Sequence, residues 1–302
     1  MRCNSFEQRM WLEDFLRSLA AERNCSPKTV QAYADDLNRF AAYFKSVDEG
    51  INWETVDPDV IRGWMIQLMD DGAKPTSVNR RLSAIRSFYT FLMKRELVKV
   101  NPATKVKGPK VPKALPTFLK ETETEQLMLR ELYPEGFEGD RDYAIICTFY
   151  ETGVRLAELT GLDQQDVDFH MGVLKVTGKR NKQRLIPFGP NLRAVWETYM
   201  KSRTERFGVD NPAFFLNLKG ERLERSRIEN LVHHYLSEVT TQKKRSPHVL
   251  RHTFATQMLN HDGDLQAVKE LLGHSSIATT EIYTHTTFEE LKKVYKKAHP
   301  RS

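Results

Sequence analysis

The chain has 302 residues, of which 40% are hydrophobic and 28% are charged. The length predicts about two domains. The proportions are typical of a globular protein, and they exclude a mainly disordered chain. No apolar run approaches the roughly 18 residues that a membrane-spanning helix needs, so we expect no membrane association. Lys and Arg outnumber Asp and Glu by 46 to 40. This surplus permits a polyanionic partner without requiring one. The three cysteines lie far apart and lack zinc-site spacing, which favours reduced thiols in a cytoplasmic protein.

Four amphipathic helices are expected in the first hundred residues. Ser5, Ser26 and Asp57 each precede an apolar pattern of helical period and act as N-caps. A fourth pattern of this period runs from about 76 to 97. Because the connecting segments are short and no strand pattern intervenes, we predict a compact helical bundle over residues 1–103.

A basic, proline-rich linker is predicted over residues 104–117. Four prolines lie between positions 101 and 117, and such a density excludes a helix interior. Ten Lys and Arg residues between positions 80 and 113 are opposed by a single Glu. A solvated helix face would explain one isolated charge run, but a run that covers both a helix and the adjoining linker suits a phosphate backbone. The residues expected to contact DNA are Arg80, Arg81, Arg86, Lys105 and Lys107.

The sequence from 118 to 302 has a mixed pattern. Short strand patterns at 167–169, 173–176 and 184–187 are separated by turn residues, and helical patterns lie on both sides of them. We therefore expect a mainly α-helical protein with a small antiparallel β-sheet (α+β), in which the second domain is residues 118–302. No glycine-rich phosphate loop is present, so nucleotide-driven chemistry is not expected.

Several polar residues lie where a helix should be apolar. Arg155 is one, although a lone Arg in such a position is usually a surface residue with a buried stem. His248 and Arg251 are three apart on the first turn of a predicted helix, and this arrangement favours an anion. His248 and His252 are four apart, but no zinc-protease Glu and no third ligand accompany them, so a metal is not expected. His274 after a helix-ending Gly, and Tyr283 as a half-buried aromatic, each fit a structural role.

Five short motifs are much more specific together than any one of them alone. They are Thr152-Gly153-Val154-Arg155, Gly178-Lys179, His248-x-x-Arg251, Leu272-Gly273-His274 and Tyr283. In this order and spacing they resemble the tyrosine recombinase (phage integrase) family, and the segments 246–256 and 271–285 are similar to its Xer branch, which resolves chromosome dimers. The resemblance covers nearly the whole chain, including the helical core-binding domain and the basic linker. One departure is Ala157, where many relatives carry Ser at a non-catalytic position.

This resemblance implies a site-specific recombinase that cuts a DNA strand by attack of a tyrosine oxygen on a phosphodiester. The products are a 3′-phosphotyrosyl bond and a free 5′-hydroxyl, which later attacks to rejoin the strands. The implied catalytic residues are Tyr283 as nucleophile, Arg155 and Arg251 as phosphate clamp, Lys179 as acid, His248 as acceptor of the tyrosine proton and His274 as a phosphate ligand. Fixed cations neutralise the charge and the phosphotyrosine keeps the bond energy, so no metal, ATP or other cofactor is expected.

The two-domain layout predicts a clamp around a double-stranded DNA recombination site. The terminal helix after position 286 carries an apolar stripe, and its family role would be docking into a neighbouring protomer. Such docking yields a homo- or hetero-tetramer with a second recombinase on two DNA sites, for which a septal DNA translocase is a candidate activator. Packing of that helix on its own domain is the simpler alternative.

Three other functions stay open. An integrase of a mobile genetic element shares the layout, although many phage integrases carry a further N-terminal domain for which a bundle beginning at Ser5 leaves no room. A type IB topoisomerase uses similar Arg, Lys, His and Tyr chemistry without strand exchange. A non-catalytic DNA-binding protein of the same fold would form no covalent adduct.

Overall fold

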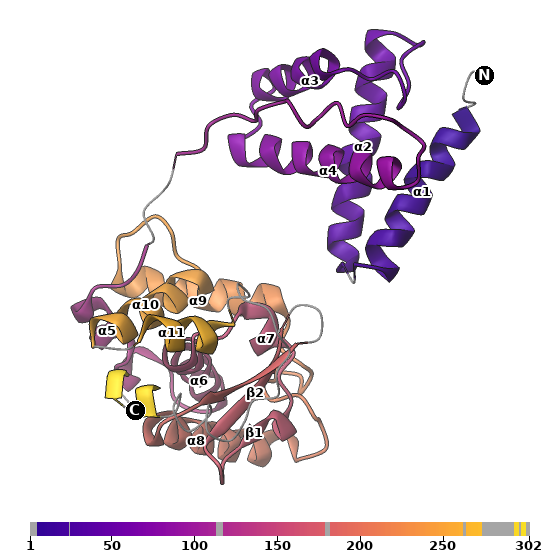
Figure 1. Cartoon of the computed structure of the whole chain (residues 1–302). Helices are drawn as coiled ribbons and strands as arrows, with labels where there is room; N and C mark the ends of the chain where they lie inside the picture. Colours follow the sequence, from indigo (N-terminus) through magenta and orange to yellow (C-terminus); the bar gives the residue numbers. More distant parts are fainter. Residues whose placement is uncertain are drawn as a thin grey trace. The chain divides into compact units, whose positions relative to one another are not determined.

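The chain divides into two compact units, residues 1–114 and 115–302 (Figure 1). The computed structural model describes residues 5–23, 25–112, 117–178, 182–261, 264–273, 293–295 and 297–299. Within these ranges no helix combines the length and apolarity needed to cross a membrane.

The described part of the first unit is built from helices with short connections. They are α1 (Ser5–Ala21), α2 (Pro27–Val47), α3 (Pro58–Asp70) and α4 (Pro75–Lys94). The Ser26 hydroxyl accepts a hydrogen bond from the Thr29 amide, and the Asp57 carboxylate accepts from two amides of the first turn of α3. These side chains satisfy amides that have no partner inside the helix, which is why α2 and α3 begin at these prolines. The predicted helical bundle is confirmed.

Aromatic side chains form the centre of this bundle. Trp53, from the loop after α2, packs against Phe88 of α4 with ring centroids 4.8 Å apart, and Phe40 lies 4.9 Å from Trp64. The Tyr89 hydroxyl donates a hydrogen bond to the Trp53 carbonyl over 2.9 Å. The loop between α2 and α3 is therefore held by both apolar packing and a buried hydrogen bond.

The second unit combines helices with a small sheet. Its described helices are α5 (Glu121–Leu127), α6 (Phe137–Thr152), α7 (Leu156–Thr160), α8 (Pro190–Phe207), α9 (Arg225–Val239), α10 (Pro247–Asn260) and α11 (Leu265–Leu272). The strands are β1 (Val167–Asp168), β2 (Val173–Thr177) and β3 (Gln183–Pro187), antiparallel in the order β1-β2-β3. The expected fold class, mainly α-helical with a small antiparallel sheet, is confirmed.

Helix α6 forms the centre of the second unit (Figure 1). It packs against α8 and α10, and nearly all of its side chains are buried. This helix is buried around most of its circumference, and its buried residues include the charged side chains of Arg141, Asp142 and Glu151. Its C-terminal end delivers the chain to the segment that contains Arg155.

The described residues of the C-terminal segment pack on their own unit. Tyr295 and Ala298 are each 1% exposed and belong to the same apolar core as α6 and α10. The Tyr295 ring stacks on His299 with centroids 5.1 Å apart, and His299 contacts Tyr150 and Phe254. Docking of this segment into a neighbouring protomer, which stays a prediction, would require these contacts to be exchanged.

Replacing Phe88 by Ala should destabilise the first unit by about 3–5 kcal/mol, because a buried ring leaves a cavity at the contact of α4 with Trp53. Urea unfolding followed by tryptophan fluorescence measures the change. Ile66→Ala is the control, since Ile66 is 62% exposed and its loss should cost less than about 0.5 kcal/mol. Equal costs for the two variants would contradict this description of the core.

Candidate active site

The turn after α6 places Arg155 at the start of α7. Gly153 has a φ of 59°, and an added Cβ would lie 2.5 Å from a ring carbon of Phe254, so only glycine fits this close approach. The chain reverses there, and Arg155 becomes the N-cap of α7. The Glu158 carboxylate accepts hydrogen bonds from the Arg155 amide over 2.8 Å and from its guanidinium over 2.9 Å. Glu158 therefore holds both the backbone and the side chain of Arg155.

Arg251 joins the ends of two helices. It lies on the second turn of α10, is 8% exposed, and donates hydrogen bonds to the carbonyls of Gly153 and Leu272. Burial lowers the pKa of Arg251 to about 10, and the charges of Arg155 and Arg184 act in the same direction. The guanidinium is nevertheless protonated at pH 7. The structure thus brings together two arginines that are 96 positions apart in the sequence.

A third guanidinium, which the motif analysis missed, belongs to Arg184 on β3. Its terminal nitrogens donate to the two oxygens of Glu158 over 2.7 and 2.9 Å, and its Nε donates to the Leu271 carbonyl over 2.8 Å. A signal for it was present in the sequence, because a strand alternates its faces. That alternation places Arg184 on the same face as the buried Ile186, where an Arg needs a carboxylate partner.

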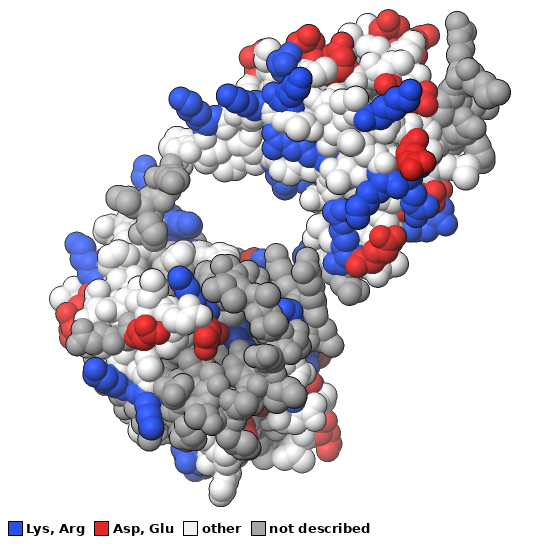
Figure 2. Space-filling view, viewed as in Figure 1, with Lys and Arg blue, Asp and Glu red and all other residues white. Residues whose placement is uncertain are grey.

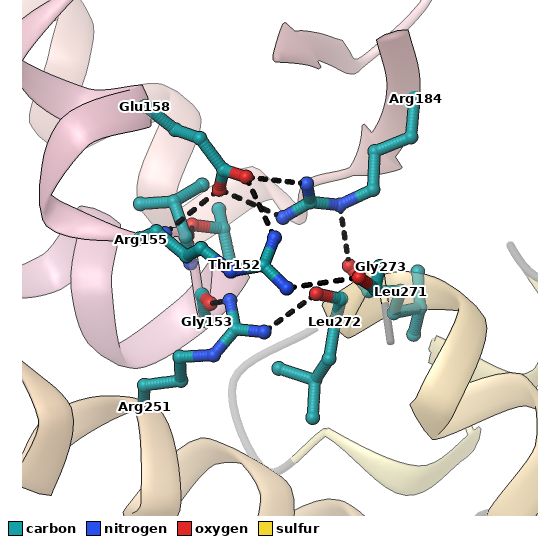
Figure 3. Close-up of polar contacts among 10 residues, drawn as sticks. Thr152, Gly153, Arg155, Glu158, Arg184, Arg251, Leu271, Leu272 and Gly273 are labelled. Atoms are coloured by element: carbon teal, nitrogen blue, oxygen red, sulfur yellow. Dashed lines mark hydrogen bonds and ion pairs between the residues drawn. The ribbon is translucent and has the colours of Figure 1, made fainter. Parts of the chain in front are cut away.

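The three arginines meet at the C-terminal end of α11 (Figure 3). Three consecutive carbonyls accept their hydrogen bonds. The Leu271 carbonyl accepts from Arg184, the Leu272 carbonyl from Arg251 and the Gly273 carbonyl from Arg155. The last carbonyls of a helix have no intrahelical partners and carry the negative end of its dipole, so cations bind there favourably. The cluster holds three guanidiniums and one carboxylate, Glu158, which binds Arg155 and Arg184, so an excess of positive charge remains that suits an anion.

Glu158 is charged in this environment. Burial by itself raises its pKa, but the hydrogen bonds and charge of Arg184, followed by those of Arg155, outweigh burial, and the pKa lies below its usual value. The carboxylate side chain is 2% exposed. A charged group at this depth is stable only with its partners in place, so Glu158 and the guanidiniums require one another.

His248 lies one turn before Arg251, on the first turn of α10, and is exposed. Burial of part of the ring, then the charges of Arg251 and Lys244, lower the pKa of His248 below 6.5. The imidazole is consequently neutral at pH 7. A neutral imidazole can accept a proton from a nucleophile, which is the property a general base requires.

Three of the expected catalytic residues, Lys179, His274 and Tyr283, lie outside the described residues. Two of them directly follow described glycines at the cluster. A Cβ added to Gly178 would lie 3.4 Å from a Glu158 oxygen. Gly273 has a φ of 63°, and its carbonyl accepts a hydrogen bond from Arg155. Both chain segments therefore leave the described part of the chain at the arginine cluster, and the convergence of all six residues stays a prediction.

The expected DNA contacts in the first unit differ in their surroundings. The Arg80 guanidinium binds both oxygens of Asp36, and the Nε of Arg81 lies 3.6 Å from the same carboxylate. Burial raises the pKa of Asp36 despite these cations. Arg86 donates to the carbonyls of Ala103 and Val106, so it fastens the chain after α4 to that helix.

Lys105 and Lys107, in contrast, are exposed. Figure 2 shows several Lys and Arg side chains on the viewed face of this unit. Within the described part of the chain, Lys105 and Lys107 have no ion-pair partner that would compete with a phosphate. Among the described residues, no group of three or more His, Cys, Asp and Glu side chains could hold a metal ion.

Replacing Glu158 by Gln should lower the free energy of unfolding at pH 7 by roughly 3–5 kcal/mol, because it leaves buried guanidiniums without their carboxylate. The folded-state pKa of Glu158 is lowered, so its contribution is fully present above about pH 4.5 and is lost as the pH falls through that lower value. Urea unfolding at pH 7, 5 and 3.5 should show the gap between variant and wild type narrowing toward acid. Glu125→Gln, at an exposed position, is the control, and a gap independent of pH would contradict the role of this carboxylate.

Comparison with known proteins accounts for both units. The model of the Phage integrase family matches residues 117–290, and that of the Phage integrase, N-terminal SAM-like domain matches residues 12–96. The chain is 38% identical to "Tyrosine recombinase XerC" of Chlorobaculum tepidum, with 97% of this chain and 95% of the relative covered. It is 40% identical to the protein of the same name from Natranaerobius thermophilus, over 96% and 99% of the two chains.

Solved structures agree on the fold. The XerH site-specific recombinase bound to palindromic difH substrate has a TM-score of 0.76 at 20% identity, over 97% of this chain and 96% of that one. The Tn1549 transposon integrase in complex with transposon right end DNA has a TM-score of 0.70 at 17% identity, over 94% and 98%. The family models and the near full-length identity together establish that the chain belongs to the phage integrase family, as a tyrosine recombinase of the XerC type.

Proposed function

We propose that this recombinase cleaves and rejoins DNA through a 3′-phosphotyrosyl intermediate at a specific site, and that it resolves chromosome dimers in the cytoplasm. The observation that carries the proposal is the convergence of Arg155 and Arg251 on the end of α11, which the segment containing His274 and Tyr283 follows in the sequence. The near full-length identity to XerC recombinases supports the same conclusion.

The arginine pair suits a phosphoryl transition state. Negative charge spreads over the non-bridging oxygens of the phosphorus, and planar guanidiniums match these oxygens with paired hydrogen bonds. Each guanidinium has five N–H donors, and the described bonds from Arg155 and Arg251 to protein acceptors use two side-chain nitrogens of each. Donors therefore remain for the phosphate, and the bonds to the protein hold them in position before DNA arrives.

In the proposed reaction, side chains of this chain accept the proton of the nucleophile and supply the proton of the leaving group. The Tyr283 oxygen attacks phosphorus as its proton passes to the neutral imidazole of His248. The bond from phosphorus to the 5′-oxygen breaks, and Lys179 donates a proton to that oxygen. His274 binds a non-bridging oxygen. Rejoining runs the same steps in reverse, with the 5′-hydroxyl of another strand as nucleophile, so neither ATP nor a metal enters the balance.

The proposed substrate is a duplex recombination site held between the two units. The similar XerH structures contain difH substrate DNA. In this chain, exposed Lys105 and Lys107 are the better candidates for phosphate contacts, since Asp36 binds Arg80 and Arg81 and two carbonyls bind Arg86. A tetramer of this chain, or with a second recombinase, would form by exchange of the C-terminal segment, and a septal DNA translocase is a proposed activator.

Tyr283→Phe should abolish the covalent protein–DNA adduct and leave binding of the DNA site nearly unchanged, because only the nucleophilic oxygen is removed. A nicked suicide substrate followed by a denaturing gel measures the adduct, and a gel-shift titration measures binding. Tyr143→Phe, on α6, should still form the adduct. An adduct that survives in Tyr283→Phe would remove Tyr283 as nucleophile.

The rate of adduct formation should decrease toward acid, with a midpoint below pH 6.5. The reason is that the pKa of His248 is lowered and that protonated His248 cannot accept the tyrosine proton. Lys244→Gln removes one of the charges that lower this pKa, so the acid limb should move to higher pH. Lys243→Gln is the matched control, since Lys243 is exposed and does not contribute to that shift. Single-turnover rates at saturating DNA test this, and an acid limb unmoved in Lys244→Gln would contradict the assignment of His248.

A further inference from the structure

A small pocket lies beside the first turn of α10, on the side of His248. It has a volume of about 260 Å³ and is lined by residues of α7, α9 and the segment that leads into α10. Its polar walls include Arg225 and His233 from α9, Arg245 before α10, and His248. Pockets that enclose whole small molecules are usually larger, about 300–1,000 Å³, so this one suits a single small group.

The charge of the pocket favours an anion. Two guanidiniums, Arg225 and Arg245, face a single carboxylate, that of Glu229. The Glu229 carboxylate accepts two hydrogen bonds of 3.1 Å from Arg225, but both side chains are about half exposed, and such a surface pair is weak. Arg225 therefore keeps part of its charge available to a ligand.

Arg245 has a buried donor that lacks a partner. Its Nε is inaccessible to solvent and makes no hydrogen bond among the described residues. A buried N–H without an acceptor costs free energy, and an anionic oxygen would satisfy it once the Arg245 side chain turns its Nε into the pocket on binding. The N-terminus of α10 also favours an anion, because the Ser246 side chain does not cap the helix. Its amides and dipole also favour an anion.

The pocket adjoins the proposed reaction centre through His248. The charges of Arg251 in the cluster and of Arg225 in the pocket both lower the pKa of this histidine, so His248 lies within electrostatic reach of both. DNA with its scissile phosphate at Arg155 and Arg251 must continue past His248. The anion nearest at hand is therefore another phosphate of the same strand rather than a free ion.

We propose that this pocket binds the DNA backbone phosphate next to the scissile one, with Arg245 as its principal ligand and Arg225 as a second. This inference rests on the proposed function, because it assumes that DNA occupies the arginine cluster. Neither residue belongs to the motifs that carry the family resemblance. A phosphate held at this second point would fix the strand direction at the cluster and help to align the scissile bond.

The test is a double-mutant cycle between protein and DNA. Neutral methylphosphonates replace, one at a time, the two phosphates on either side of the scissile phosphate, and Kd is measured in the Tyr283→Phe background, where no strand is cut. One position should lose about tenfold or more in affinity, the size of a hydrogen bond to a charged group. In Arg245→Gln the same substitution should cost much less, because only the weaker Arg225 contact is left to lose, and the slope of log K against log salt should fall by about one.

Controls separate this pocket from general loss of charge or of fold. Lys243→Gln, two residues away and exposed, should keep the full methylphosphonate penalty. Arg245→Lys retains the charge but not the Nε donor, and should recover only part of the affinity. Unfolding curves check that each variant is folded.

In the Tyr283→Phe background, a methylphosphonate penalty of the same size with and without Arg245→Gln at every position would overturn the proposal. The proposal would also be overturned if inorganic phosphate stabilised the protein through Arg245 while no methylphosphonate position showed coupling to Arg245. Adduct formation by the wild-type chain on a suicide substrate is scored separately. Its absence would overturn the proposed function, whereas an adduct without coupling would overturn the pocket alone.

Discussion

The arginine cluster of the second unit depends on the buried carboxylate of Glu158. Glu158 binds Arg184 through both oxygens and Arg155 through its amide and guanidinium, and it is nearly inaccessible to solvent. Without this negative charge, the guanidiniums of α7, β3 and α10 would repel one another in a poorly hydrated space. With it, they can be held at one place and still carry a net positive charge. The site is therefore preorganised for an anion by a cost already met during folding.

Arg184 links the sheet to this arrangement. It pairs with Val176 across β2 and β3, and its guanidinium reaches both Glu158 and the end of α11. The hairpin that leads to Lys179 and the helix that leads to His274 are consequently attached to one ion pair. A displacement of the strand would move the carboxylate, and through it Arg155. This connection gives the small sheet a function in a mainly helical protein.

Both units use the same physical device for different ends. In the first unit Asp36 is buried and binds Arg80 and Arg81, while carbonyls hold Arg86. Part of the positive charge of this basic segment is thus bound by partners within the unit. In the second unit one carboxylate binds two arginines, carbonyls hold the third, and the excess charge remains. The number of Lys and Arg residues in a segment is a poor measure of what it offers to DNA; the placement of the acidic partners decides it.

The sequence by itself determined the elements and the motifs. Periods of 3.6 and 2, the caps at Ser26 and Asp57, and the prolines after position 101 are local signals, and the helical bundle and the three strands followed from them. Arg155, His248 and Arg251 were identifiable because their types and spacing match a known chemistry. Only the tertiary structure decided which charges meet. That Arg184 binds Glu158, that Arg251 spans the ends of α6 and α11, and that Asp36 withdraws two arginines are contacts between distant segments, and no local pattern encodes the distance between two side chains.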